Sequence, residues 1–254
     1  MKLRLGDSAE AKGGRARFAI DGDNLADTFH GALVDLITRY GLKDLCEAGG
    51  GANPLLGVSE VAKLGLRYTV LDVSAEEIGK ADPTYATTLC DIAGPTPPQA
   101  CVFDLVFSQM LAEHLSDGAA FHRNVFHMLK PNGLAFHSYP TLYALPRVLN
   151  WALPEGLASS LLSVVNPHRD LRGHQVKFPA WYRWCEGPTP RQVRRLEAIG
   201  FEVLDFVGIF GHNGYYSRLP FMLNIHQKFS AFLRRHEVAW QTSFAYVLLR
   251  KPAG

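Results

Sequence analysis

The sequence predicts an α/β fold with a doubly wound, mainly parallel sheet of seven strands, and three observations carry this prediction. Predicted strands alternate with predicted helices from residue 25 to residue 139, which is the pattern of a parallel sheet covered by helices. A glycine-rich turn, Gly49-Gly50-Gly51, follows the first strand of this series. Acidic residues then stand at the ends of the next two strands, at Asp72 and Asp91.

Helices are expected where apolar residues recur at intervals of three and four positions. The clearest case is 25–40, whose apolar stripe includes Phe29 and Leu36 and which Gly41 ends. Pro54 suits the first position of the next helix, where its missing N–H is not needed. The expected helices cover 25–40, 54–63, 75–80, 118–129 and 190–199.

Strands are expected in short runs of apolar and β-branched residues bounded by turn signals. The turn Lys130-Pro131-Asn132-Gly133 separates the fourth helix from the strand that follows it. Residues 1–24 are polar and rich in Gly, Arg and Asp, so we expect an irregular or partly ordered arm there. The expected strands cover 42–48, 68–72, 84–90, 103–108, 134–139, 201–210 and 242–249.

The composition fits one globular domain and argues against several other classes of protein. Of the 254 residues, 47% are hydrophobic and 20% are charged, which is not the profile of a disordered chain. No run of apolar residues is long enough for a membrane-spanning helix, and the first residues lack the apolar stretch of a secretory signal. The four cysteines have neither metal-binding nor disulfide spacing. We therefore expect a cytoplasmic protein without a bound metal.

Charge is distributed unevenly along the chain. Residues 1–166 carry a net charge of −5 and residues 167–254 a net charge of +7. Aromatic and apolar residues interrupt the basic part, so it does not resemble a basic tail. A solvated surface of mixed charge explains this balance. The alternative is a face that meets an anion, such as a phosphorylated substrate, a lipid headgroup or a nucleic acid.

The glycine-rich turn and the acids behind it favour a nucleoside ligand. Open α/β sheets bind ligands beyond the carboxyl ends of their strands, and a carboxylate placed there, such as Asp72, can accept both hydroxyls of a ribose. A nicotinamide-binding turn follows the pattern G-x-G-x-x-G, whose third glycine allows close packing around a pyrophosphate. Here Gly49 and Gly51 match, but Pro54 stands at the third position. The turn therefore argues for a nucleoside without a pyrophosphate.

Five segments form an ordered series across about residues 42–139. They are Leu45-Cys46-Glu47-Ala48-Gly49-Gly50-Gly51-Ala52-Asn53-Pro54, Tyr68-Thr69-Val70-Leu71-Asp72-Val73-Ser74, Cys90-Asp91-Ile92, 103–115 and 128–134. In this order and spacing they resemble the class I S-adenosylmethionine-dependent methyltransferases. The resemblance implies a Rossmann-like fold, with S-adenosyl-L-methionine as the cofactor and S-adenosyl-L-homocysteine as the product.

The resemblance also implies roles for single residues. Glu47 would orient the turn and reach the amino acid end of the cofactor, Asp72 would bind the ribose hydroxyls, and Asp91 would bind the adenine amino group. For Glu47 and Asp91 the alternative is a hydrogen bond within a cap or turn, and for Val73 and Ile92 it is core packing. The implied cofactor-binding residues are Glu47, Gly49, Gly50, Gly51, Asp72, Val73, Asp91, Ile92, Ser108 and Gln109.

The second half of the chain matches the end of this family and adds two segments to it. The family closes its sheet with a helix and two strands, the last of them antiparallel, and 190–210 and 242–250 match that ending. Beyond the cofactor-binding core, 25–140, the segments 141–189 and 211–241 are extra. Because both follow carboxyl ends of strands, we expect them to form substrate lids over a single domain.

A second, narrower resemblance links the extra segments to family members found in glycan and lipid-linked sugar pathways. It rests on His168-Arg169-Asp170, Lys177-Phe178-Pro179-Ala180 and Cys185-Glu186-Gly187-Pro188-Thr189. Basic residues in these segments can hold a phosphate or carboxylate of an acceptor. The candidate substrate-binding residues are Arg169, Lys177, His212, Tyr215 and Tyr216.

Histidines are the candidates for the catalytic base, because methyl transfer to an oxygen or nitrogen atom releases a proton near neutral pH. His114 follows the fourth core strand beside the expected cofactor residues, with a polar contact at a helix start or a cofactor-lining role as its alternatives. His168 and His174 stand in the first extra segment, where Asp170 can orient either ring. His137 is expected to be a core histidine. The sequence does not choose among the first three.

These observations predict an S-adenosylmethionine-dependent methyltransferase that acts on a hydroxyl, as an O-methyltransferase, or on an amine. Its acceptor is expected to be a small metabolite or a glycan, with an anionic or lipid-linked acceptor as one option. The alternatives are a non-catalytic relative that binds a nucleoside and a nicotinamide oxidoreductase. The oligomeric state does not follow from the sequence.

A nucleic acid and a membrane surface are the two other partners that the sequence bears on. A nucleic acid is not expected, because the fourth strand ends in Ser108-Gln109-Met110 and lacks the Asn/Asp-Pro-Pro-Tyr/Phe signature of amino methylation on bases. The stretches 142–165 and 219–233 are apolar with scattered basic residues. We expect them to be lid helices, and contact with a membrane surface is the alternative.

Overall fold

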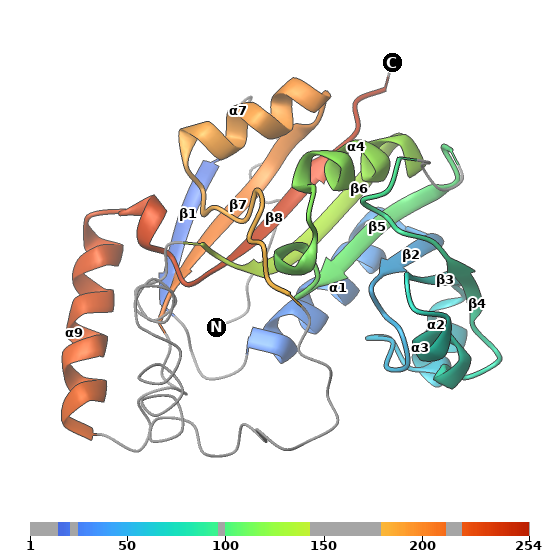
Figure 1. Ribbon diagram of the computed structural model, residues 1–254, viewed down its shortest axis with the longest axis horizontal. Helices are drawn as coiled ribbons and strands as arrows, with labels where there is room; N and C mark the ends of the chain where they lie inside the picture. The colour runs from blue at the N-terminus through green and yellow to red at the C-terminus, as the bar shows by residue number, and fades with distance from the viewer. Residues whose placement is uncertain (1–14, 21–24, 96–99, 143–178, 212–219, 254) are drawn as a thin grey trace.

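The computed structural model describes residues 15–20, 25–95, 100–142, 179–211 and 220–253 (Figure 1). Its strands are β1 Arg15–Ile20, β2 Asp44–Ala48, β3 Arg67–Asp72, β4 Ala86–Leu89, β5 Phe103–Gln109, β6 Leu129–Pro140, β7 Glu202–Phe210 and β8 Phe244–Arg250. Its helices are α1 Leu25–Tyr40, α2 Val58–Leu64, α3 Ala75–Lys80, α4 Gly118–Met128, α7 Pro190–Ile199 and α9 Pro220–Arg235, with the 3-10 turns η1 Ala112–His114 and η2 Ala239–Gln241.

The strands form one sheet in the order β1-β7-β8-β6-β5-β2-β3-β4. Neighbouring strands are parallel except at β8, which runs antiparallel between β7 and β6. The predicted α/β class, the parallel arrangement and the antiparallel last strand are therefore confirmed. The sheet has eight strands, however, where seven were expected.

Two apolar layers hold the helices against the sheet. On one face Phe29, Leu33 and Leu36 of α1 are fully buried, and the Phe29 ring stacks on Phe136 of β6 at 4.4 Å between centroids. The opposite face buries side chains of α4 and α7, including Phe121. The stripe predicted for 25–40 is thus the core-facing side of α1, and Gly41 follows it with a φ of +62°.

Within residues 1–24, where the sequence predicts an irregular or partly ordered arm, Arg15–Ile20 forms a regular element, the edge strand β1. This strand pairs with β7, and Nε of Arg17 donates to Oδ1 of Asp205 across 2.9 Å. Asp205 is only 1% exposed, so the pairing supplies a cation to a buried carboxylate. The partner strand lies far along the sequence, and local composition does not reveal it.

Several element boundaries also differ from the prediction. α2 begins at Val58 and not at Pro54, because residues 51–57 form the turns that follow β2. β4 is shorter than the expected 84–90. β6 starts at Leu129, and the expected turn over 130–133 is a bulge within it, where Asn132 has a φ of +63° and the register with β5 shifts.

The second extra segment, 211–241, contains α9, which lies beside β1 and β7 at the edge of the sheet (Figure 1). The sequence predicts a lid helix over 219–233, and α9 confirms a helix at this place, while its role as a lid stays a prediction. Most of the first extra segment lies outside the described residues, so the lids stay a prediction. Among the helices that the structure describes, none is long and apolar enough to cross a membrane.

Two histidines are buried within the layer between α4 and the sheet. His122 of α4 and His137 of β6 have ring centroids 5.8 Å apart, and Nδ1 of His137 lies 2.8 Å from the Ser108 hydroxyl oxygen. Burial lowers the pKa of His122 to about 3 and the pKa of His137 well below its usual range. His137 is the core histidine that the sequence predicts.

We predict that this buried pair makes folding stability fall on acidification. The unfolded chain binds protons at imidazoles of ordinary pKa near 6.5, and the folded chain does not, so each histidine removes about 1.4 kcal/mol of stability per pH unit below that value. Urea denaturation at about pH 7 and pH 5.5 tests this. The drop in unfolding free energy should be smaller by about 1 kcal/mol in His122→Gln. The exposed His127 provides the control, and His127→Gln should behave as wild type. Equal drops in both variants would contradict the prediction.

Candidate functional site

The expected ligand crevice lies at the point where the order of the strands reverses. The chain runs from β2 outward through β3 to β4, and it then crosses to β5 on the other side of β2. Open α/β sheets bind ligands outside the carboxyl ends of the strands at such a switch point. The loops from the two sides meet there, since a Cβ atom on Gly49 would lie 2.9 Å from Cδ1 of Leu111.

The glycine turn after β2 has a shape that other residues adopt poorly. Gly49 and Gly51 have φ angles of +77° and +46°, in the left-handed region that favours glycine. A Cβ on Gly50 would lie 2.9 Å from the carboxyl carbon of Glu47. A Cβ on Gly51 would lie 3.2 Å from Oδ2 of Asp72. The three glycines therefore let the turn lie close against Leu111, Glu47 and Asp72.

Glu47 fixes this turn through hydrogen bonds to its carboxylate. Its carboxylate is buried and accepts the backbone N–H of Leu55 at 3.0 Å on Oε2 and at 3.2 Å on Oε1. The Tyr68 hydroxyl donates a second bond to Oε2. Burial raises the pKa of Glu47 to about 6, and the bonds from Tyr68 and Leu55 partly oppose that rise. The turn-orienting role is visible here, and the expected reach to the amino acid end of a cofactor stays a prediction.

Asp72 and Asp91 stand at the carboxyl ends of β3 and β4, and each keeps one oxygen available. Oδ1 of Asp72 accepts the Ser74 N–H at 2.9 Å, and Oδ1 of Asp91 accepts the Ala93 N–H at 2.9 Å. Within the described part of the chain, neither Oδ2 atom accepts a hydrogen bond. Turn-capping thus accounts for half of each carboxylate, which leaves Oδ2 of both residues for a ligand.

The two apolar candidates beside these acids differ in exposure. Val73 is 67% exposed at the crevice, whereas Ile92 is buried and packs in the core layer under α4. On the β5 side, Ser108 is fully buried with its hydroxyl against His137, and Gln109 is partly exposed. Val73 and Gln109 therefore offer surface to a ligand in this structure, while Ile92 and Ser108 support the crevice from within.

His114 lies in η1, directly after the loop that leaves β5. Its Nδ1 is 3.0 Å from the Pro179 carbonyl oxygen, which only accepts, so Nδ1 carries the proton and Nε2 keeps its lone pair. Nε2 is 3.8 Å from Oε1 of Glu113. This arrangement sets the tautomer that a general base needs and places a carboxylate where it stabilises the protonated ring.

The described end of the first extra segment is fastened to η1 and α7. The carbonyl of Glu113 accepts the N–H groups of Trp181 at 2.7 Å and Tyr182 at 3.0 Å. The Thr189 hydroxyl caps α7 by accepting the Gln192 N–H at 3.2 Å. Glu186 accepts the Thr189 hydroxyl at 3.1 Å, together with a bond from Arg195. The segment Cys185–Thr189, which carried the narrower resemblance, therefore has a structural role as the anchor of α7.

The remaining candidates do not fall within the described residues. The structure does not report on the two other candidate bases or on the candidate acceptor residues. They are His168, His174, Arg169, Lys177, His212, Tyr215 and Tyr216.

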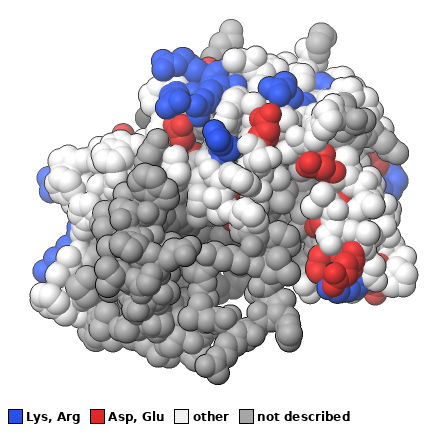
Figure 2. Space-filling view, in the orientation of Figure 1, with Lys and Arg blue, Asp and Glu red and all other residues white. Residues whose placement is uncertain are grey.

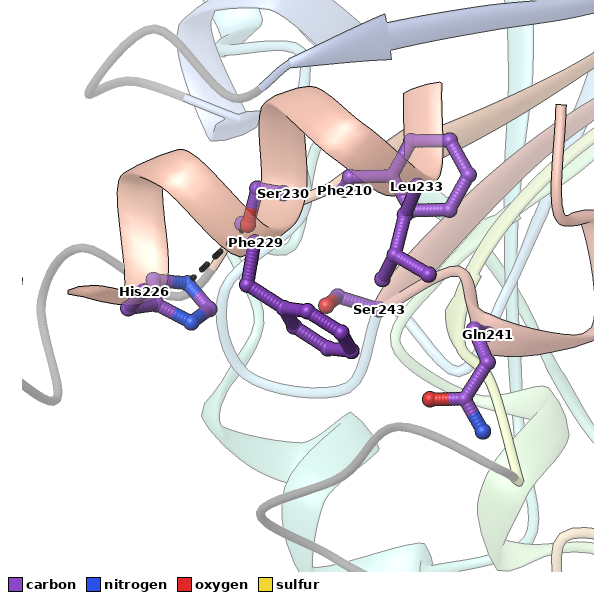
Figure 3. Close-up of a pocket in the computed structure, with 8 residues that line it drawn as sticks. Phe210, His226, Phe229, Ser230, Leu233, Gln241 and Ser243 are labelled. Atoms are coloured by element: carbon purple, nitrogen blue, oxygen red, sulfur yellow. Dashed lines mark hydrogen bonds between the residues drawn. The ribbon is translucent and has the colours of Figure 1, made fainter. Parts of the chain in front are cut away.

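Sequence reasoning missed a small cavity between α9 and the carboxyl end of β7 (Figure 3). Its volume of about 20 Å³ suits a water molecule. His226 and Ser230 face each other from adjacent turns of α9 at 3.5 Å, and Gln241 and Ser243 line the opposite side. The four-residue spacing of His226 and Ser230 within the helix predicted over 219–233 is the signal that could have indicated this contact.

Comparison with known proteins places this geometry in context. A family model described as a methyltransferase domain matches residues 25–205. A search of curated proteins found no match. The structure resembles an S-adenosylmethionine-dependent methyltransferase from Mesorhizobium loti, at 18% identity and a TM-score of 0.51, over 90% of this chain and 99% of that one.

Two further solved structures share the fold. One is a proposed sarcosine dimethylglycine methyltransferase from Galdieria sulphuraria, with 14% identity, a TM-score of 0.52 and coverage of 89% of this chain and 85% of that one. The other is phosphoethanolamine N-methyltransferase 2 from Haemonchus contortus in complex with S-adenosylhomocysteine, with 12% identity and a TM-score of 0.53. This chain is covered to 92% and spans 54% of that protein. Identities this low show the fold alone.

The residues at the switch point are of the types that S-adenosylmethionine requires. Oδ2 of Asp72 is available beside the closely placed Gly51, as a ribose diol requires. Exposed Val73 offers an apolar surface for adenine, and Asp91 follows at the end of the next strand. The residues that would hold the cofactor are Gly49, Gly50, Gly51, Asp72, Val73, Asp91 and Gln109.

We predict that Asp72→Ala weakens binding of S-adenosylhomocysteine by roughly 10- to 100-fold, since it removes hydrogen bonds between a charged acceptor and the ligand hydroxyls. Calorimetric titration measures this directly. Asp35→Ala, which removes an exposed carboxylate on α1, is the matched control and should bind as wild type. An unchanged dissociation constant in folded Asp72→Ala would contradict the assigned site.

Proposed function

The chain belongs to the methyltransferase domain family, and from this we propose that it transfers a methyl group to a hydroxyl or amine of a small metabolite or sugar-containing acceptor. S-adenosylmethionine is the cofactor, and when bound it supplies an electrophilic methyl group on a sulfonium. The observation that supports the proposal best is the orientation of His114, whose Nδ1 lies 3.0 Å from the Pro179 carbonyl oxygen and whose Nε2 lies 3.8 Å from Oε1 of Glu113.

His114 is the residue that we assign as general base. The Pro179 carbonyl fixes its ring, and the carboxylate of Glu113 lies 3.8 Å from Nε2. About a third of the His114 side chain is exposed, so an acceptor can reach it. A general base of this kind typically contributes 10²- to 10⁴-fold to a rate. His168 and His174 remain the alternative bases.

The proposed reaction is an in-line displacement. With S-adenosylmethionine held by the glycine turn and Asp72, the acceptor oxygen or nitrogen would bond to the methyl carbon as the carbon–sulfur bond breaks, and the electron pair would stay on sulfur. The proton of the acceptor would pass to Nε2 of His114. Holding the two reactants in a productive geometry would lower the barrier.

The acceptor class follows from charge and from the relatives. Residues 167–254 carry a net charge of +7, which suits an acceptor with a phosphate or carboxylate. The similar structures include methyltransferases named for sarcosine and dimethylglycine and for phosphoethanolamine. These compounds and sugar nucleotides are the first acceptors to try. A cytoplasmic location is part of the proposal and agrees with the four free thiols.

We predict that His114→Gln lowers the rate of methyl transfer by 10²-fold or more, since Gln cannot take up the proton. Release of S-adenosylhomocysteine over the acceptor panel measures the rate, and calorimetry should show unchanged cofactor binding. His127→Gln, at an exposed position of α4, should match wild type.

Full activity in folded His114→Gln would overturn its assignment and direct attention to His168 and His174. Cofactor binding without transfer to any acceptor would favour the non-catalytic nucleoside-binding relative. Reduction or oxidation of a nicotinamide cofactor would favour the oxidoreductase.

A further inference from the structure

The helix α9 carries a row of large apolar side chains that face away from the protein. Phe221 is 77% exposed, Ile225 48%, Phe229 40% and Phe232 54%. Their spacing of four, four and three residues places them along one side of the helix. Large apolar side chains that serve the core of a protein are not this exposed. A contiguous apolar row at the surface marks an interaction site. We call these four residues the α9 stripe.

The stripe is not the side by which α9 is attached to the protein. Ser230 and Leu233 are buried and face the carboxyl end of β7, where they line the small cavity with Phe210 (Figure 3). Phe229 stands between the two sides, since its ring reaches the cavity and is still 40% exposed. One side of α9 therefore packs against the protein. The α9 stripe lies beside that side and, apart from Phe229, takes no part in this packing.

Basic residues accompany the stripe, and acidic residues are absent from α9. Lys228, Arg234 and Arg235 are all exposed, and the sixteen residues of the helix include neither Asp nor Glu. At the left edge of Figure 2, where α9 lies in Figure 1, blue Lys and Arg atoms stand among white ones. With 100° per residue, Lys228 and Arg235 project next to the stripe on its solvent side. This side of α9 therefore combines apolar surface with positive charge.

We propose that the α9 stripe rests on an anionic lipid surface, with Lys228 and Arg235 at the level of the headgroups. A helix that lies in the membrane interface has this composition, with large apolar residues on one side and Lys or Arg beside them. Trp240, 55% exposed in the 3-10 turn after the helix, belongs to the residue type enriched at the same depth. A nucleic acid would use the charges but leave the four apolar side chains without apolar contact.

The position of α9 connects this surface with the crevice. The helix packs on the carboxyl end of β7, and the glycine turn and Asp72 lie at the carboxyl ends of β2 and β3 in the same sheet. Docking through α9 would therefore bring the carboxyl ends of the parallel strands, and the crevice beyond them, toward the lipid. The inference stands on α9 alone and does not depend on the proposed methyl transfer.

Co-sedimentation of the full-length protein with vesicles tests the proposal. The vesicles are phosphatidylcholine alone and phosphatidylcholine with about 30% phosphatidylglycerol. We expect binding to the anionic vesicles, little binding to the neutral ones, and a marked loss at about 0.5 M NaCl. The double variant Phe221→Asp/Ile225→Asp and the double variant Lys228→Glu/Arg235→Glu should each bind about tenfold less tightly.

Matched controls come from the opposite edge of the sheet and from α2. Leu89→Asp changes a 60% exposed apolar residue on the edge strand β4, and Lys63→Glu reverses an exposed charge. Both should bind vesicles as wild type does. All variants should bind S-adenosylhomocysteine as wild type does, which shows that they fold and separates this test from that of the enzymatic activity.

Three results would overturn the proposal. The first is the absence of binding to anionic vesicles. The second is equal binding by the stripe variant and wild type, or an equal loss in the controls. The third is concentration-dependent dimerisation that Phe221→Asp/Ile225→Asp abolishes, without vesicle binding, since this would assign the stripe to contact with a second copy of the chain. Binding to a nucleic acid in place of vesicles would likewise exclude the lipid.

Discussion

The buried carboxylate of Glu47 is the interaction on which the candidate site depends. It accepts the Leu55 N–H beyond the glycine turn and the Tyr68 hydroxyl from the neighbouring strand, so it joins β2, β3 and the turn in one place. A pKa near 6 in place of 4.5 corresponds to about 2 kcal/mol of lost stability at neutral pH. An active site often contains such a destabilised group, because a fixed geometry is worth more to function than local stability.

On the β5 side of the crevice, too, hydrogen bonds fix the geometry of a candidate site residue. η1 carries His114, and the segment 179–182 is fastened to it through the Pro179 and Glu113 carbonyls. The Thr189 cap then joins this segment to α7. The orientation of the proposed base therefore depends on backbone contacts from a part of the chain about 65 residues away. The loop after β2 lies against the loop after β5. The loop after β5 is in turn bonded to the described end of the first extra segment, so the three parts form one continuous unit around the crevice.

The local features of the site could be predicted from the sequence. The glycine turn, Asp72 and Asp91 are each defined by residues within a short strand–turn–helix unit, and the structure places all of them at one edge of the sheet. β1 could not be predicted, because its partner β7 lies some 190 residues later and Arg17 is needed only by the buried Asp205. The burial of Ser108 against His137 was hidden for the same reason, since it depends on the register between β5 and β6. The candidate bases His168 and His174 remain predictions, because they lie outside the described residues.

The most direct test of the central claim is a crystal structure of the protein with S-adenosylhomocysteine. The account predicts the ligand between the loops after β2 and β5, with its ribose hydroxyls on the Asp72 carboxylate, its adenine near Val73 and Asp91, and the Glu47 bonds to Leu55 and Tyr68 intact. A ligand bound elsewhere, or bound in this crevice with its ribose away from Asp72, would contradict it.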